Sequence, residues 1–193
     1  AIVEIVPRLG LPTLDKATLI RPRLYGTYRQ AKASFGSLDA ILFRKTAQPT
    51  GIPDLDLELV DGRARLDSEF GVIGIKADGA GNLRDGFTGI AAAAAPRLAL
   101  GGCSAQGASA YGRVTMAASA PRFAGPVRVA ALTCPRQGVT LRQTGAQVAV
   151  KTNAAFDSVA GTYDLTTGAL TGPGSRAASA SGKGDFTFAK GDL

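Results

Sequence analysis

Residues 55–59 read Leu55-Asp56-Leu57-Glu58-Leu59, an unbroken alternation of apolar and acidic side chains. Successive side chains of a β-strand point to opposite faces, so this pattern predicts a strand with one buried and one solvated face. The same period of two recurs in segments 127–129, 139–142, 148–150 and 186–188. The sequence therefore predicts a mainly β protein built from half-buried strands.

Turn signals that contain glycine separate these segments. They recur at roughly the 8–12-residue spacing of an all-β chain, and we interpret them as the loops of successive hairpins in a meander. The signals are Asp61-Gly62, Asp78-Gly79, Asp85-Gly86, Gly101-Gly102, Gly125-Pro126, Gly161, Thr167-Gly168 and Gly172-Pro173-Gly174.

Residues 35–43 break the period of two. Ser37 is suited to cap a short helix in which Leu38, Ile41 and Leu42 fall on one face. We expect this helix to pack over one end or edge of the sheet.

The side chains between the large aliphatic residues are mostly small, as in segments 105–110 and 117–120. A filled sandwich core would need more side-chain volume, whereas a curved sheet whose apolar face holds a ligand would not. We therefore predict an elongated, curved antiparallel sheet that forms an open hydrophobic groove, with one short helix near residues 35–43. We expect residues 1–193 to be a single segment of a longer β-groove protein, with a loose C-terminal part over 172–193.

The chain contains no histidine, which excludes a Ser-His-Asp triad, a Cys-His pair and a His-ligated zinc within it. Asp54, Asp56 and Glu58 place three carboxylates on one strand face, as a calcium site or a glycosidase would, but the solvated side of a strand already explains them. Segment 78–82 has some likeness to a calcium loop or a nucleotide-binding turn, and we interpret it as a hairpin turn. We expect no enzymatic activity, no catalytic residue, no metal and no cofactor.

Positive charge is in excess, with 22 Lys and Arg against 15 Asp and Glu and a net charge of +7. Such an excess favours nucleic acid, anionic lipid headgroups or an acidic partner. The basic residues occur singly, and aromatic residues make up only 6% of the chain, so no stacking platform accompanies them. This distribution favours a solvated face, and we expect no nucleic-acid partner.

Cys103 and Cys134 are the two cysteines of the chain, and each stands beside a turn signal. Their spacing does not fit a zinc knuckle. In an oxidising compartment they would bridge neighbouring strands and stabilise the fold by about 3–4 kcal/mol, whereas in a reducing cytosol they would be two buried thiols. The spacing alone leaves both alternatives open.

Several short motifs follow one another in a set order. They are Arg21-Pro22-Arg23-Leu24 at the end of a strand, Phe35-Gly36-Ser37-Leu38-Asp39, Ala64-Arg65-Leu66 leading to Phe70-Gly71, Gly81-Asn82-Leu83-Arg84-Asp85-Gly86-Phe87, Gly102-Cys103, Gly125-Pro126 and Leu132-Thr133-Cys134. In this order they resemble the AsmA-like superfamily, and more closely its YdbH-type branch in Gram-negative bacteria. The resemblance covers most of residues 11–150.

The resemblance implies a long periplasmic protein, anchored in the inner membrane, whose hydrophobic β-groove carries phospholipid toward the outer membrane. The implied partners are phospholipid, the two membranes through other parts of the protein, and an outer-membrane-associated protein. The periplasm is oxidising, so the resemblance also favours a Cys103–Cys134 disulfide. The residues expected to line the groove are Leu55, Leu57, Leu59, Leu66, Ile73, Ile75, Leu83, Phe87, Leu98, Leu100, Val127, Val129, Val139, Leu141, Val148 and Val150.

A structural or adhesive secreted β-protein without lipid cargo is the alternative function. The apolar face of the sheet discriminates between the two. A continuous apolar face that is open along its length favours a lipid conduit, whereas a closed interior filled with side chains argues against one.

Overall fold

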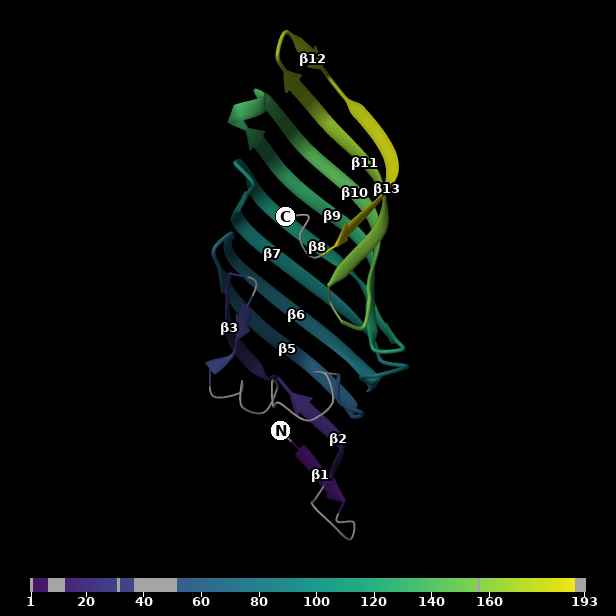
Figure 1. Cartoon of the computed structure of the whole chain (residues 1–193). Coiled ribbons are helices and arrows are strands. Elements are labelled where there is room, and N and C mark those ends of the chain that lie inside the picture. Colours follow the sequence, from purple (N-terminus) through teal and green to yellow (C-terminus); the bar gives the residue numbers. More distant parts are fainter. Residues whose placement is uncertain (1, 7–12, 31, 37–51, 156, 190–193) are drawn as a thin grey trace.

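The computed structural model describes residues 2–6, 13–30, 32–36, 52–155 and 157–189, whose strands form one open sheet (Figure 1). The strands are β1 (Ile2–Val6), β2 (Thr13–Ile20), β3 (Arg23–Arg29), β4 (Lys32–Ser34), β5 (Asp56–Ser68), β6 (Gly71–Asn82), β7 (Thr88–Leu100), β8 (Cys103–Ala117), β9 (Ala120–Cys134), β10 (Val139–Thr152), β11 (Ser158–Gly172), β12 (Ser175–Ala177) and β13 (Ala180–Ala189). The predicted mainly β, elongated sheet is confirmed.

Strands β5 to β11 form an antiparallel meander in which each strand pairs with the next one along the chain. Both β12 and β13 then pair with β11, and β11 and β13 arch along their length at this end of the sheet (Figure 1). The 3₁₀ helix η2 (Pro135–Gln137) links β9 to β10. The meander follows from short hairpin connections, which join antiparallel neighbours.

Two parallel pairings at the other end of the sheet were not predicted. β2 runs parallel to the first half of β5, and β3 runs parallel to its second half. The two short strands follow one line, interrupted at Arg21 and Pro22, which lie beside a bulge at Asp61 and Gly62 of β5. The Arg21 backbone N–H donates to the Val60 carbonyl at 2.7 Å, which ties the interruption to the bulge.

Only some of the predicted turns are turns. The signals at residues 85–86, 101–102 and 172–174 lie where one strand ends and the next begins, as predicted. The predictions at residues 61–62, 78–79, 125–126, 161 and 167–168 are wrong, because β5, β6, β9 and β11 run through them. The turn between β8 and β9 was missed: Ala118 and Ser119 both have positive φ angles there, without the Asn or Gly that usually marks such a turn.

Glycines inside the strands allow groups of neighbouring strands to approach closely and do not mark chain reversals. A Cβ on Gly125 would lie 2.2 Å from the carbonyl oxygen of Tyr111 on the neighbouring strand. A Cβ on Gly79 would lie 2.6 Å from the ring of Phe87 and 2.8 Å from the Cα of Gly89. Glycine in a strand marks such close approaches as often as it marks turns, so sequence pattern alone confuses the two.

The backbone is irregular at neighbouring positions of β8, β10 and β11. Gly107 in β8 and Gln143 in β10 have left-handed φ angles of 60° and 53°. On β11, the Thr167 hydroxyl lies 3.0 Å from the carbonyl oxygen of Arg142 and 3.1 Å from that of Ala169. Thr167 is 4% exposed, so its buried hydroxyl finds carbonyl acceptors at the point where the ladder is disturbed.

Residues 37–43 of the predicted helix lie outside the described residues. The strand predicted at the C-terminal end is longer than expected, because β13 pairs with β11 over its full length from Ala180 to Ala189. Among the described residues, no helix has the length and apolar character needed to cross a membrane.

Candidate functional site

The sheet has one apolar face and one charged face. Ile75 and Lys76 are neighbours in β6 and point to opposite sides, so we call the side of Ile75 the apolar face and that of Lys76 the charged face. Directly opposite residues on paired strands share a face. Through such pairs the apolar face continues from Ile75 to Ala64 in one direction and to Ala93, Ala110, Val127, Ala146, Leu165 and Gly182 in the other.

The predicted lining residues inside the strands lie half-buried on the apolar face. They are Leu57, Leu59, Leu66, Ile73, Ile75, Leu98, Val127, Val129, Leu141, Val148 and Val150. Leu55, Leu83, Phe87 and Val139 are half-buried at or beside strand ends. Leu100 ends β7, and its side chain lies outside the described part. Contact of these residues with lipid stays a prediction.

The centre of the apolar face is low in side-chain volume. It consists of Ala91, Ala93 and Ala95 on β7 and Ala108 and Ala110 on β8, which we call the alanine strip. The flanking strands β6 and β9 carry isoleucine and valine side chains on the same face. An alkyl chain lying on the alanine strip would approach the backbone closely and contact taller aliphatic groups on both sides.

Aromatic rings of the apolar face lie over glycines of neighbouring strands. A Cβ on Gly112 would lie 2.8 Å from the Phe123 ring, and one on Gly161 would lie 2.9 Å from the Phe186 ring. Phe87 covers Gly79 in the same way. Of these three rings, only Phe87 was among the predicted lining residues. The period of two around Phe186 was the available signal for a place on this face, whereas the covered glycines have no local signal.

No second layer of described strands packs against this face. All extensive contacts between described elements join hydrogen-bonded neighbours in the sheet. The buried hydrophobic residues of the described part are the alanines Ala17, Ala95 and Ala105, and no large side chain there is fully buried. A soluble sheet ordinarily covers one face with helices or a second sheet. The described residues therefore leave an extended apolar face half-exposed.

Cys103 and Cys134 form a disulfide, so the bridge that was one of the two alternatives is present. The pairing of Ser104 with Thr133 places the two cysteines opposite each other on β8 and β9. The bridge ties two neighbouring strands at one edge of the sheet, next to the turn at Gly101 and Gly102.

The scattered basic residues of the sequence gather on the charged face. They alternate with apolar residues along the strands, and the exposed members are Arg23, Arg63, Arg65, Lys76, Arg97, Arg113, Arg122, Arg128, Arg142, Lys151 and Lys183. Hollows open between these long side chains, one of about 800 Å³ over Gly74, Ala92 and Ala94. The sequence predicted a solvated face for each residue, and the register brings these residues to one side.

Asp61 neutralises two cations of the charged face. Arg63 and Lys76 are directly opposite each other on β5 and β6. Their nitrogens lie 3.5 Å and 3.2 Å from Oδ1 of Asp61, an oxygen that is shielded from solvent. The Lys76 ammonium at this oxygen, with help from the charge of Arg63, lowers the pKa of Asp61 below its ordinary value, although desolvation opposes this. A second ion pair joins Lys183 to Asp164, with Nζ 2.7 Å from the Asp164 carboxylate, and this contact raises the pKa of Lys183.

The predicted acidic row does not converge on one site. Asp54 accepts a hydrogen bond from Asn82 at 2.8 Å and lies 3.8 Å from a guanidinium nitrogen of Arg84. Asp56 and Glu58 are exposed on β5. Within the described ranges, no group of three or more acidic or cysteine residues is placed to hold a metal ion.

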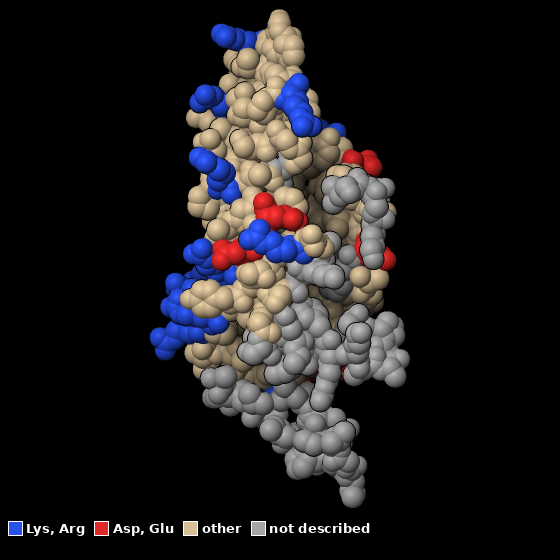
Figure 2. All heavy atoms as spheres, turned by 60° about the vertical axis from the view of Figure 1, so that its left-hand side comes forward, with Lys and Arg blue, Asp and Glu red and all other residues tan. Residues whose placement is uncertain are grey.

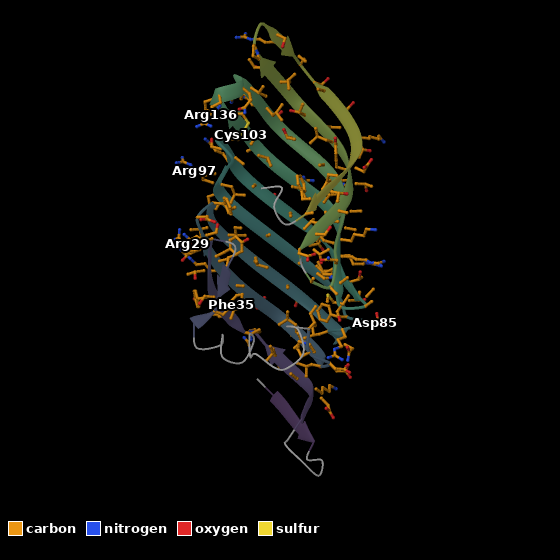
Figure 3. The ribbon with its side chains drawn as sticks, in the orientation of Figure 1. Arg29, Phe35, Asp85, Arg97, Cys103 and Arg136 are labelled. Carbon is orange, nitrogen blue, oxygen red and sulfur yellow. A yellow bond between two sulfur atoms is a disulfide. The ribbon has the colours of Figure 1, made fainter. Side chains whose placement is uncertain are left out.

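Arginines also lie along one rim of the sheet, which is formed by strand ends and by η2. Figure 3 places Arg29, Arg97 and Arg136 along the same edge, from the end of β3 through β7 to η2, and Asp85 at the opposite edge. Figure 2 shows Lys and Arg spread along this side of the molecule among uncharged residues, with a few Asp and Glu beside them near the middle. The charge is thus carried by the charged face and by one rim of the sheet.

Comparison of the chain with protein-family models, curated proteins and solved structures finds no match.

Proposed function

We propose that this chain is a segment of a lipid-transfer protein of the bacterial envelope, in which the apolar face holds the acyl chains of phospholipid. The observation that carries the proposal is the row of apolar residues that crosses the sheet from Ala64 to Gly182 without a described layer packed on it. The motif order that resembles the YdbH-type AsmA-like proteins supports the same assignment and a place in the periplasm, with an anchor elsewhere in the protein.

Moving a phospholipid through water without an apolar surface costs a large free energy. Each CH₂ group that leaves water gains about 0.8 kcal/mol, so a lipid with two long chains crosses an aqueous gap slowly without cover. A surface of small and aliphatic side chains removes this penalty along the whole path. It also lacks a deep pocket in which a lipid would stall, so the expected binding is weak and spread over many contacts.

The alanine strip provides the closest approach for an acyl chain. Its side chains are short, and the neighbouring Ile75 and Val127 rise on either side. The basic rim of Arg29, Arg97 and Arg136 lies where phosphate headgroups would remain in water while the chains lie on the apolar face (Figure 3). This arrangement matches the two chemistries of a phospholipid to two adjoining surfaces.

Photocrosslinking in living cells tests the proposal. A benzoylphenylalanine at Ala93 lies on the apolar face, and one at Ala94 lies on the charged face of the same strand. We expect lipid adducts from position 93, identified by mass spectrometry, and none from position 94. Adducts at neither position would contradict the proposal and favour the structural or adhesive alternative.

A matched pair of charge substitutions tests the same surface by function. Ile75→Asp places a charge on the apolar face, whereas Lys76→Asp changes the charge of the opposite face at the next residue. We expect Ile75→Asp to abolish co-purification of phospholipid while the far-ultraviolet circular dichroism stays that of a sheet. Lys76→Asp should retain the lipid. Equal lipid content in both variants would exclude the apolar face as the binding surface.

A further inference from the structure

Seven of the exposed cations of the charged face take part in none of the ion pairs of the described residues, and three of these seven lie close together. Arg113 on β8, Arg122 on β9 and Lys151 on β10 are exposed, and they take part in none of the ion pairs of that part of the chain. Asp185 on β13 lies opposite Thr162 and forms no ion pair with them. The three positive charges are therefore not neutralised by the described chain itself.

The register brings these cations together. Arg122 is directly opposite Lys151 on one side and Thr115 on the other. Arg113 stands two residues before Thr115 in β8 and so shares its face. Opposite side chains in an antiparallel pair have Cβ atoms about 4.5–5.5 Å apart, and like charges at such positions destabilise the pair. The sheet thus carries an unfavourable charge cluster at this point.

The cations surround a hollow that fits a small anion. Its volume is about 450 Å³, and no acidic residue of the described part lines it. The lining consists of the three cations, the hydroxyl-bearing Thr115 and Thr162, small residues that include Ala124 and Ala149, and parts of Phe123 and Val150. Short side chains in the floor let a ligand descend between the long basic side chains. Guanidinium groups bind oxyanions through paired N–H donors, and a lysine adds a point charge.

Another directly opposite cation pair of this face has a carboxylate that the pair Arg122 and Lys151 lacks within the described residues. Arg63 and Lys76 are also directly opposite each other, and there Asp61 supplies the negative charge from within the chain. The pair Arg122 and Lys151 has the same cross-strand geometry without the carboxylate. We propose that the hollow bordered by Arg113, Arg122 and Lys151 is a binding site for a phosphate group, which takes the place that Asp61 fills at the first pair.

The phosphate group has two sources that the site chemistry does not distinguish, a phospholipid headgroup and a free phosphate. The proposal does not rest on lipid transport, because the hollow opens on the charged face. Crosslinks from Ala93 and phosphate binding at this hollow therefore succeed or fail independently.

Titration calorimetry at constant ionic strength provides the test. Inorganic phosphate is titrated into the oxidised protein, into Arg122→Gln with Lys151→Gln, and into the control Arg63→Gln with Lys76→Gln, which removes the same charge. We expect saturable binding that weakens at least tenfold in the first variant and less than twofold in the control. No saturable binding to the unaltered protein, or equal weakening in both variants, would overturn the proposal.

A second measurement needs no variant. Acetylation of lysine ε-amines by an N-hydroxysuccinimide ester is followed by mass spectrometry with and without phosphate, with chloride matching the ionic strength. Phosphate should slow the acetylation of Lys151 at least threefold while that of Lys76 is unchanged. Equal protection of both lysines would mean general screening and would overturn the proposal.

Vesicles identify the source. Liposomes of phosphatidylcholine with 30% phosphatidylglycerol are sedimented with each variant, beside liposomes of phosphatidylcholine alone. Loss of sedimentation in the Arg122→Gln, Lys151→Gln variant only would assign the site to an anionic lipid headgroup. Free-phosphate binding without any dependence of vesicle binding on these residues would assign it to a soluble phosphate compound. Failure of both arms would overturn the site.

Discussion

The two faces of this sheet are built on the same strands, one residue apart, and they are held by different interactions. Cys103 stands two residues before Ala105, which is opposite Leu98 of the apolar face, so the disulfide joins β8 to β9 on that face. Aromatic rings on the same face cover glycines of adjoining strands. On the charged face the neighbouring side chains are long, exposed and mutually repulsive unless a carboxylate intervenes. Stability therefore resides mainly on the apolar face, whereas the charged face keeps unbalanced charge. Each face can be tested against the other with matched substitutions.

The largest expected difference concerns two pairs of opposite residues. Replacing Cys103 and Cys134 by serine removes the bridge on the apolar face and should lower the free energy of unfolding by about 3–4 kcal/mol, through the entropy of the unfolded chain. Replacing Arg122 and Lys151 by serine removes a pair of like charges on the charged face, and stability should stay the same or rise slightly. Urea unfolding monitored by circular dichroism measures both. Equal losses in the two double variants would contradict the assignment of stability to the apolar face.

The next difference concerns one aromatic residue on each face. Phe87 is half-buried over Gly79, whereas Tyr111 on the charged face is 56% exposed. Phe87→Ala should cost about 1–2 kcal/mol, because half of a phenylalanine side chain returns to water and a glycine is uncovered. Tyr111→Ala should cost less than about 0.5 kcal/mol. The same unfolding experiment measures both variants. A larger loss of stability at Tyr111 than at Phe87 would contradict the claim that stability resides mainly on the apolar face.

The period of two at residues 55–59 was enough to predict a mainly β fold, because alternation directly encodes the two faces of a strand. The same alternation also placed Leu57, Leu59 and Val127 on the apolar side of their strands. It did not predict that β2 and β3 pair in parallel with β5, since a parallel partner is chosen by contacts distant in sequence. The turn prediction at Asp61-Gly62 was wrong because a bulge uses the same left-handed conformation as a turn.

The charged face was the largest omission from the sequence interpretation. Arg122 and Lys151 are 29 positions apart in the chain, and only the register of β9 against β10 makes them neighbours. The basic residues therefore had to be interpreted one by one as solvated. The alternation Val127-Arg128-Val129 indicated that the arginine points to the other face of the strand than the valines. It did not indicate which arginines of different strands lie side by side.

Asp61 makes the stability contributed at the Arg63–Lys76 pair depend on pH, whereas the Arg122–Lys151 pair has no such carboxylate among the described residues. Its pKa lies below the ordinary value of 3.8 because Lys76 and Arg63 stabilise the carboxylate. The stabilisation is therefore complete above pH 3.8 and is lost as the pH falls through the lower pKa of the folded state. Asp61→Asn keeps a residue that tolerates the left-handed backbone at this position, where φ is 47°.

We expect Asp61→Asn to be less stable than the unaltered protein at pH 7, and the difference to shrink as the pH falls below 3.8. Chemical unfolding at a series of pH values measures it. Asp56, an exposed aspartate whose carboxylate is in none of the ion pairs of the described part, provides the control substitution Asp56→Asn. A difference that persists unchanged in acid would show that the Asp61 carboxylate charge is not the cause.

The smallest expected change in stability is a gain, at Thr115→Glu. Thr115 is directly opposite Arg122, so Thr115→Glu supplies the second cation pair with the carboxylate that it lacks. An opposite-charge pair across two strands contributes about 0.2–1 kcal/mol, so the variant should be slightly more stable at neutral pH although a strand-favouring threonine is lost. The same carboxylate occupies the position proposed for phosphate, and phosphate binding should disappear. If the variant gains stability and phosphate still protects Lys151, the unbalanced charge of the cation pair is not what binds phosphate. The carboxylate of residue 115 would then have neutralised the pair without displacing the ligand.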